Sequence, residues 1–151
     1  MNVESILGIS TVLFGIMSGT YFAFSIVVMP ALKQLPAKLA SEVMKQINSD
    51  ILRSLFMLFF WLSTFMAFVL ICLHINWSVT ISGACYVVGM FGTTAICNVP
   101  LNKKLAQATT DELDHLWATY LKYWTRWNHI RTICSVFALV LSTHELANFD
   151  L

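Results

Sequence analysis

The sequence has very few charged residues for its length. Only 11% of its 151 residues are Asp, Glu, Lys or Arg, whereas an ordinary water-soluble domain has about 25%. The chain is 58% hydrophobic and lacks the polar residues needed to cover a water-facing surface. This composition excludes an ordinary soluble domain. It also lacks repeats, linkers and low-complexity stretches, so we expect a single transmembrane domain over residues 1–151.

The cysteines lack the spacing of a redox or metal-binding motif. The four cysteines form no C-x-x-C pair, and none has a zinc-type spacing to histidine. We therefore expect thiols without a chemical role, no metal ion and no cofactor. We also expect no nucleic-acid partner.

Long uncharged intervals predict four membrane-spanning helices. A bilayer core about 30 Å thick needs about 20 apolar residues in helical form. Residues 5–29 carry no charge, and the interval between Arg53 and Lys103 is long enough for two spans joined at HINWS (74–78). The predicted spans are residues 5–29, 52–75, 78–98 and 124–147. The predicted fold is an all-α integral membrane four-helix bundle, with short amphipathic helices in the cytoplasmic loops and the lipid bilayer as its partner.

Basic residues are absent from the tails and from the 74–78 turn. All nine Lys and Arg lie in residues 33–53 or 103–131, and the positive-inside rule places such segments in the cytoplasm. No basic residue precedes the first span and no clear cleavage site follows it, so we expect it to be retained. The sequence thus predicts a multi-pass protein of the inner or plasma membrane. Both termini, with Glu4, Glu145 and Asp150, are expected outside the cytoplasm.

Two loop segments have the pattern of short helices. Pro36 begins the segment PAKLASEVMKQIN, in which Leu39, Val43 and Ile47 recur every fourth residue. This spacing predicts an amphipathic helix on the cytoplasmic leaflet. Thr109-x-x-Glu112 fits a capping box. The helix that it starts can run without a break into the fourth span.

The stretch WNHIR (127–131) places polar groups at the start of the last span. The uncharged interval between Arg131 and Glu145 is about 20 Å of helix at 1.5 Å per residue, which is shorter than the hydrocarbon core. At least one of the two charges is therefore expected below the membrane surface. Such a group is a functional candidate, although an arginine can also snorkel to the headgroups.

Helical angles separate the polar residues of this stretch. At about 100° per residue, Asn128 and Arg131 share a face with small and aromatic residues, whereas His129 lies on the opposite, β-branched face. The first face holds Tyr120, Trp124, Trp127, Asn128, Arg131, Ser135, Ala138 and Ser142. Small residues line helix contacts in membranes, so we expect Asn128 and Arg131 to point into the bundle.

Asparagines at the end of the third span offer partners to this face. Asn98 and Asn102 are one turn apart, and Pro100 between them removes a backbone donor. A guanidinium has five N–H donors and amides supply acceptors. The four residues Asn98, Asn102, Asn128 and Arg131 can form a structural clamp or a ligand site. The sequence leaves the two alternatives equal.

Two motifs of the second half resemble those of a known family. NVPLNKKLA (98–106), followed by YLKYWTRWNHIRT (120–132), resembles the paired signature of the anthrone oxygenase family, and VMPAL (28–32) extends the resemblance to the first span. The resemblance implies four transmembrane helices. For the fungal members of polyketide pathways it implies oxidation of an anthrone to an anthraquinone by molecular oxygen, without a metal.

If this chemistry holds, roles follow for the polar residues. An anthrone has an acidified carbon whose proton a base removes, and the enolate then reacts with oxygen. His129 is the candidate base, and Arg131, Asn128 and Asn98 are candidate donors to the oxyanion. Asn102 is placed with the substrate-binding residues. A slot for a small aromatic ligand would be formed by Tyr120, Trp124 and Trp127.

Other functions remain open on the sequence. The main alternative is a non-enzymatic membrane protein, binding or structural, whose Asn/Arg cluster holds helices together. A lesser alternative is a metal or haem site formed by His74, His144 and Glu145 near the outer surface. The ladder of Gly15, Gly19 and Ala23, and likewise Gly89 and Gly92, predicts close helix packing inside the bundle. The ladder also leaves a homo-oligomer open.

Overall fold

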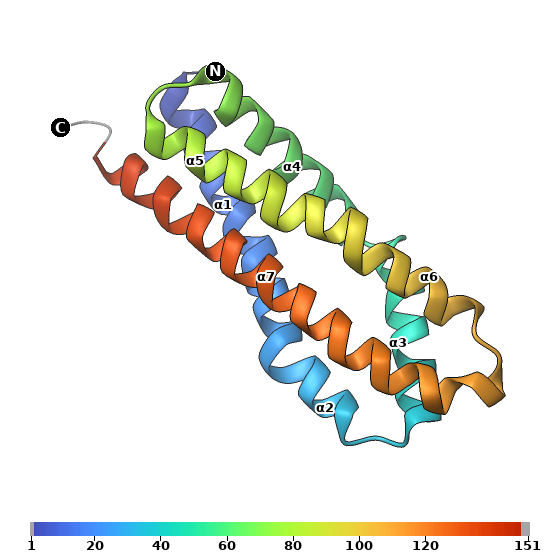
Figure 1. The fold of residues 1–151 in the computed structure, drawn as a ribbon. Coiled ribbons are helices and arrows are strands. Elements are labelled where there is room, and N and C mark those ends of the chain that lie inside the picture. Colours follow the sequence, from blue (N-terminus) through green and yellow to red (C-terminus); the bar gives the residue numbers. More distant parts are fainter. Residues whose placement is uncertain (1, 149–151) are drawn as a thin grey trace.

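The computed structural model describes residues 2–148 and contains no strand among them. Four long helices lie side by side in an elongated bundle (Figure 1). Each is long and apolar enough to cross a membrane. The start of the first helix and the end of the last lie at the same end of the bundle, as an even number of spans predicts. Asp150 lies outside the described residues.

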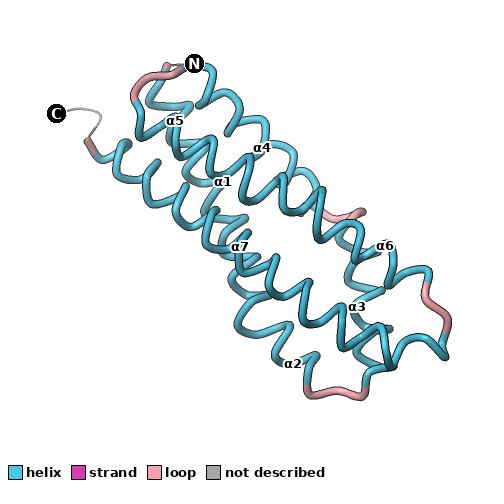
Figure 2. Tube along the Cα trace, in the orientation of Figure 1, coloured by secondary structure: helices cyan, strands magenta, loops and turns pink. Residues whose placement is uncertain are grey.

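Six α-helices and three π-helical segments build these four rods, a seventh α-helix lies between the first two in sequence, and only short loops join the helices (Figure 2). The first rod comprises α1 (Val3–Ala23), the π-helical segment Phe24–Val28 and α2 (Met29–Lys33). A separate helix, α3 (Ala37–Ile51), precedes the second rod, α4 (Leu55–Leu73). The third rod comprises α5 (Trp77–Cys85), the π-helical segments Tyr86–Gly92 and Thr94–Asn98, and α6 (Val99–Gln107). The fourth is α7 (Leu113–Ala147), which one 3₁₀ turn (Thr110–Glu112) precedes.

The predicted helix ends follow from local chemistry. His74 closes α4 in the left-handed conformation, with φ of 44°, and the Asn76 side chain caps α5 by accepting from Val79 N–H at 2.9 Å. The predicted turn at residues 74–78 is therefore confirmed, although α5 already begins within it. The Thr109–Glu112 capping box is also confirmed. As the sequence allowed, α7 runs without a break into the fourth predicted span.

Two rods contain a π-helical segment directly before a proline. The N–H of Met29 bonds the Phe24 carbonyl five residues back, and Val99 bonds the Thr94 carbonyl in the same way. Pro30 or Pro100 follows immediately. Because proline has no N–H, the α-helical pattern is already broken at this point, and a wider turn is tolerated there. Such turns are frequent at functional sites.

At one end of the bundle, here called the α3 end, α3 takes the place of the second rod. The second rod, α4, has only 19 residues, whereas the first, third and fourth rods have 31, 31 and 38 residues and extend beyond it. Beyond the start of α4, α3 packs against α6 and α7 (Figure 1). Its Ala40 and Met44 are buried against Leu105 and Trp117. The predicted amphipathic helix is confirmed, and its contact with a leaflet stays a prediction.

The core at the other end packs aromatic and small residues. Phe14 of α1 stacks on Tyr86 with ring centroids 4.1 Å apart, and the Tyr86 hydroxyl donates to Ser63 Oγ of α4 at 2.8 Å. Gly89 lies so close to Cys134 of α7 that an added Cβ would overlap its side chain. The predicted close packing is confirmed at Gly89.

The predicted packing of the first-rod ladder is wrong at two of its three positions. Gly19 and Ala23 are exposed, and a Cβ added at Gly19 would meet no atom within 4 Å. Only Gly15 faces a neighbour, with Leu139 at 3.8 Å from such a Cβ. The larger residues Phe14, Met17 and Tyr21 pack inward instead, because a broad apolar side chain buries more surface than a glycine.

Candidate functional site

A cavity of about 670 Å³ lies at the junction of α1, α3, α4, α7 and the third rod. Lys45, Asn48 and Lys103 line it at the α3 end, here called the polar mouth, and further polar lining comes from Thr94, Asn98 and Arg131. The opposite part is aromatic. It is lined by Phe56, Phe60, Trp61 and Phe91. A volume of this size accommodates a small organic ligand.

Arg131 reaches this cavity from the middle of α7 and is only 6% exposed. Its Nη2 donates to Asn128 Oδ1 at 2.6 Å, and its Nη1 donates to Thr94 Oγ1 at 3.3 Å. The guanidinium carbon lies 4.5 Å from the ring centroid of Tyr21 and 5.2 Å from that of Trp124. The prediction that Arg131 points into the bundle is confirmed.

The environment of Arg131 leaves its charge only partly compensated. None of its hydrogen-bond partners among residues 2–148 is a carboxylate, and its buried Nε has no partner. Each aromatic face attracts a desolvated cation by about 2 kcal/mol or more. Taking an ion out of water costs several kcal/mol, and an opposite charge is the usual compensation. The site therefore favours an additional anionic or strongly polar acceptor beside Arg131.

Asn98 supplies the complementary group on the third rod. It is buried and lines the cavity. Its Nδ2 donates to the Trp124 carbonyl at 3.3 Å, whereas its Oδ1 is buried without a partner. Since the carbonyl oxygen of Trp124 can only accept, the amide orientation is fixed and the unpaired atom is the acceptor. Two residues that line the cavity therefore each have one buried polar atom without a partner, a donor on Arg131 and an acceptor on Asn98.

Asn102 and Asn128 serve packing, and the predicted four-residue network is divided into separate parts. Asn102 Oδ1 accepts from Tyr120 Oη and Trp124 Nε1, both at 2.8 Å. Asn128 Nδ2 donates to the Tyr21 carbonyl at 2.9 Å and to Ser25 Oγ at 2.8 Å. Asn102 therefore holds α6 to α7, and Asn128 holds α1 to α7. Asn102 also lines the cavity, whereas Asn128 does not.

Of the remaining predicted site residues, only Trp124 lines the cavity. Trp124 is buried and lines the cavity, while Tyr120 is buried behind it with ring centroids 6.2 Å apart. Trp127 is half-buried and His129 is exposed, and neither lines the cavity. His129 lies on the face of α7 opposite Arg131, as the helical angles predict.

Several cavity residues were missed on the sequence. Tyr21 and Thr94 contact the guanidinium, yet they belong to predicted spans that contain no Asp, Glu, Lys or Arg. Asn48 of α3 donates to Tyr120 Oη at 3.4 Å. A signal existed only for the aromatic part, because the segment FMLFFW (56–61) is unusually rich in aromatic residues.

The candidate metal or haem ligands near the other end do not come together. His74 pairs with Thr80 Oγ1 at 2.9 Å, and Glu145 accepts from Asn76 Nδ2 at 2.5 Å. His144 lies against Asn148. Residues 2–148 contain no group of three His, Cys, Asp or Glu side chains that could hold a metal ion.

The fold is that of a helical membrane protein, and the bundle contains a cavity lined by aromatic and polar side chains. The anthrone oxygenase family profile matches residues 46–141, well over half of the chain. The chain therefore belongs to the anthrone oxygenase family, as the NVPLNKKLA and YLKYWTRWNHIRT motifs predicted. No curated protein and no solved structure matches it.

Proposed function

We propose that the protein oxidises a flat, lipophilic aromatic compound with molecular oxygen in the cavity beside Arg131. The observation that carries this proposal is the pair of unpartnered atoms, Asn98 Oδ1 and Arg131 Nε, at an aromatic-lined cavity. An apolar pocket with a few convergent polar groups is the usual form of a small-molecule site. Membership of the anthrone oxygenase family supports this type of reaction.

The reaction can be written with an anthrone as the substrate. The central CH₂ carbon loses one proton to give an enolate, which donates electrons to O₂ and forms a carbon–oxygen bond. The second C–H bond and the O–O bond then break. The carbon becomes a ketone, one oxygen atom stays in the quinone, and the other leaves as water. Four electrons pass from the carbon to O₂, and no further oxidant is needed.

Arg131 is assigned the main role in this step. Negative charge develops on the substrate oxygen as the enolate forms, and a preorganised cation beside it lowers the barrier. Arg131 is held in place by Asn128 and by the rings of Tyr21 and Trp124. Asn98 Oδ1 can accept from a substrate hydroxyl. The released proton later joins the departing oxygen atom, so that both hydrogens of the CH₂ group end in the water molecule.

Arg131→Lys tests this assignment. Lysine keeps the charge but loses the planar fork and its stacking on both rings. We expect oxygen uptake with an anthrone to fall by about a hundredfold in kcat/KM, the typical cost of removing one oxyanion donor. Purified protein in lipid vesicles, followed with an oxygen electrode, gives this measurement. Saturable quenching of tryptophan fluorescence by the same compound reports binding separately.

Three variants control the experiment. Arg126→Lys makes the same change at an exposed neighbour on α7 and should leave uptake unchanged. Trp124→Phe should remove most of the saturable quenching if the compound lies against that ring. Given its exposed position, His129→Ala should keep uptake within about twofold, and a large loss would restore His129 as the base. Absence of both quenching and uptake in the folded wild type would contradict the proposed function.

A second candidate is a non-enzymatic membrane protein whose polar residues hold helices together. The favouring observation is that every side-chain polar atom of Asn128 is used in contacts within the protein. The same assay separates the two. Saturable binding without oxygen uptake supports a binding protein, and neither supports a structural role.

We also propose that the α3 end faces the cytoplasm of a plasma or inner membrane. Lys33, Lys38 and Lys45 of α2 and α3 lie there, as do Lys103 and Lys104 of α6, and basic segments stay on the cytoplasmic side. Single cysteines at Lys38 and Lys104, in a cysteine-free protein, should resist an impermeant thiol reagent applied outside cells. A cysteine at Asp150 should react with it. Protection of position 150 from the outside reagent would contradict the orientation.

A further inference from the structure

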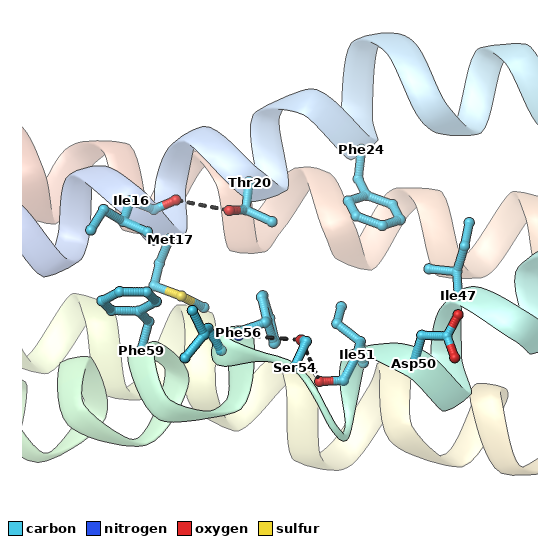
Figure 3. A pocket seen from close by; sticks show the side chains of 11 residues that line it. Ile16, Met17, Thr20, Phe24, Ile47, Asp50, Ile51, Ser54, Phe56 and Phe59 are labelled. Carbon is cyan, nitrogen blue, oxygen red and sulfur yellow. Dashed lines mark hydrogen bonds between the residues drawn. The ribbon is translucent and has the colours of Figure 1, made fainter.

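A second hollow lies on the outside of the bundle, between α1 and the corner that joins α3 to α4 (Figure 3). Its volume is about 500 Å³. Ile16, Met17 and Thr20 line it from α1, and Phe56 and Phe59 line it from α4. We call this hollow the α1–α4 groove.

The residues around the groove are of the types that contact lipid. Leu55 and Ile16 at its lips are 71% and 41% exposed, and they belong to rods that are apolar enough to cross a membrane. Asp50 stands near one end of it, on α3, and Ser54 stands midway along it, where α3 meets α4 (Figure 3). An exposed apolar groove with a carboxylate near one end fits lipid tails along its length and headgroups at that end.

The groove is separated from the cavity by a single layer of side chains. Five residues line both hollows: Thr20, Phe24, Ile47, Ile51 and Phe56. Of these, Phe56 stands next to the polar site, since its ring lies 6.3 Å from the ring of Tyr21 in an edge-on arrangement. Tyr21 in turn covers the guanidinium of Arg131. Movement of one phenylalanine ring would therefore join the groove to the space beside Arg131.

We propose that the α1–α4 groove is a lateral entrance through which a flat apolar compound dissolved in the bilayer reaches the cavity, with Phe56 as its gate. The proposal rests on the proposed function for the identity of the natural ligand. A lipophilic ligand is concentrated in the membrane, so an opening toward lipid admits it without transfer through water. The polar mouth at Lys45 and Lys103 serves water-soluble species instead.

A cysteine at position 94 reports how fast a reagent reaches the cavity, and this measurement depends neither on catalysis nor on ligand affinity. Thr94 lines the cavity and does not line the groove. The four native cysteines are first replaced by alanine, and Thr94→Cys is added. In lipid vesicles, the rate of its modification is measured with N-(1-pyrenyl)maleimide, which is flat and membrane-soluble. A sulfonated maleimide, which stays in water, is used in parallel.

Two blocking variants separate the entrances. Leu55→Trp places an indole ring in the groove, and Ala106→Trp places one at the polar mouth. We expect Leu55→Trp to slow modification of the position-94 cysteine by the pyrenyl reagent by about tenfold. Modification by the sulfonated reagent should keep its rate. Ala106→Trp should do the reverse. Phe56→Ala should speed the pyrenyl reagent.

Several results would overturn the lateral entrance. The pyrenyl reagent could modify Leu55→Trp and Ile16→Trp at the same rate as the Thr94→Cys parent. Leu55→Trp could also slow both reagents equally. Either result would contradict the proposal. An unreactive cysteine at position 94, in protein that keeps its helical circular dichroism, would show a cavity closed to the bilayer. These results leave the oxygen-uptake assay untouched, so the entrance and the proposed function can fail independently.

Discussion

Replacing Asn128 by leucine is expected to lower the free energy of unfolding in detergent by about 3 kcal/mol. The side chain makes three hydrogen bonds, to the Tyr21 carbonyl, to Ser25 Oγ and from Arg131 Nη2. A bond to a charged group contributes about 1.5–3 kcal/mol, and a bond between membrane helices about 0.6 kcal/mol. Leucine has nearly the same shape, so lost packing adds little. Unfolding by SDS titration measures the change.

Two further substitutions divide this effect between its causes. Asn128→Asp keeps an acceptor for Arg131 but loses the donor to α1, and we expect it to cost less than leucine does. Ser25→Ala removes one acceptor and leaves Arg131 paired, so its cost should be under about 1 kcal/mol. A leucine variant as stable as the wild type would show that Asn128 does not hold α1 to α7.

Gly89→Ala should destabilise the bundle by about 2 kcal/mol, within the usual range for an overpacked core. A Cβ at this position would overlap the Cβ and Sγ atoms of Cys134, which belong to the facing helix and have little room to move. The expected readouts are a lower midpoint in SDS titration and a lower yield of folded protein.

The third rod offers a matched control for Gly89. A Cβ at Gly92 would meet only the Val87 carbonyl oxygen at an ordinary 3.6 Å, so Gly92→Ala should be neutral or slightly stabilising, because alanine favours a helix. Adding Cys134→Gly to Gly89→Ala should restore part of the lost stability. Equal effects of the two alanine substitutions would contradict close contact at Gly89.

The sequence predicts the buried face of α7 well, and the reason is geometric. A helix of this length has a fixed angle per residue, so the shared face of Tyr120, Asn128 and Arg131 follows from spacing alone. Position 129 is set apart from this face by the same rule. Burial of the first three and exposure of His129 agree with it.

The spacing of residues along a helix does not predict which neighbouring helix supplies their hydrogen-bond partners. Asn128 bonds α1 rather than the asparagines of the third rod, because the order in which rods pack decides which backbone is near. The cavity depends on α3 lying beside the short α4, an arrangement with no local signal. Gly19 and Ala23 show the same limit, since small residues suit a close contact without specifying that one exists.

The π-helical segment at Thr94–Asn98 has a consequence for how the length of this chain can change. The extra residue in this wider turn fixes the direction in which the side chains of α6 point. Among them, Asn102 contacts α7 and Leu105 packs with residues of α3. Loss of a single residue there would turn α6 by about 100°. Insertions and deletions between residue 94 and the second motif are therefore expected to fall in the loop at 108–109, where no continuous helix fixes the angle of the residues that follow.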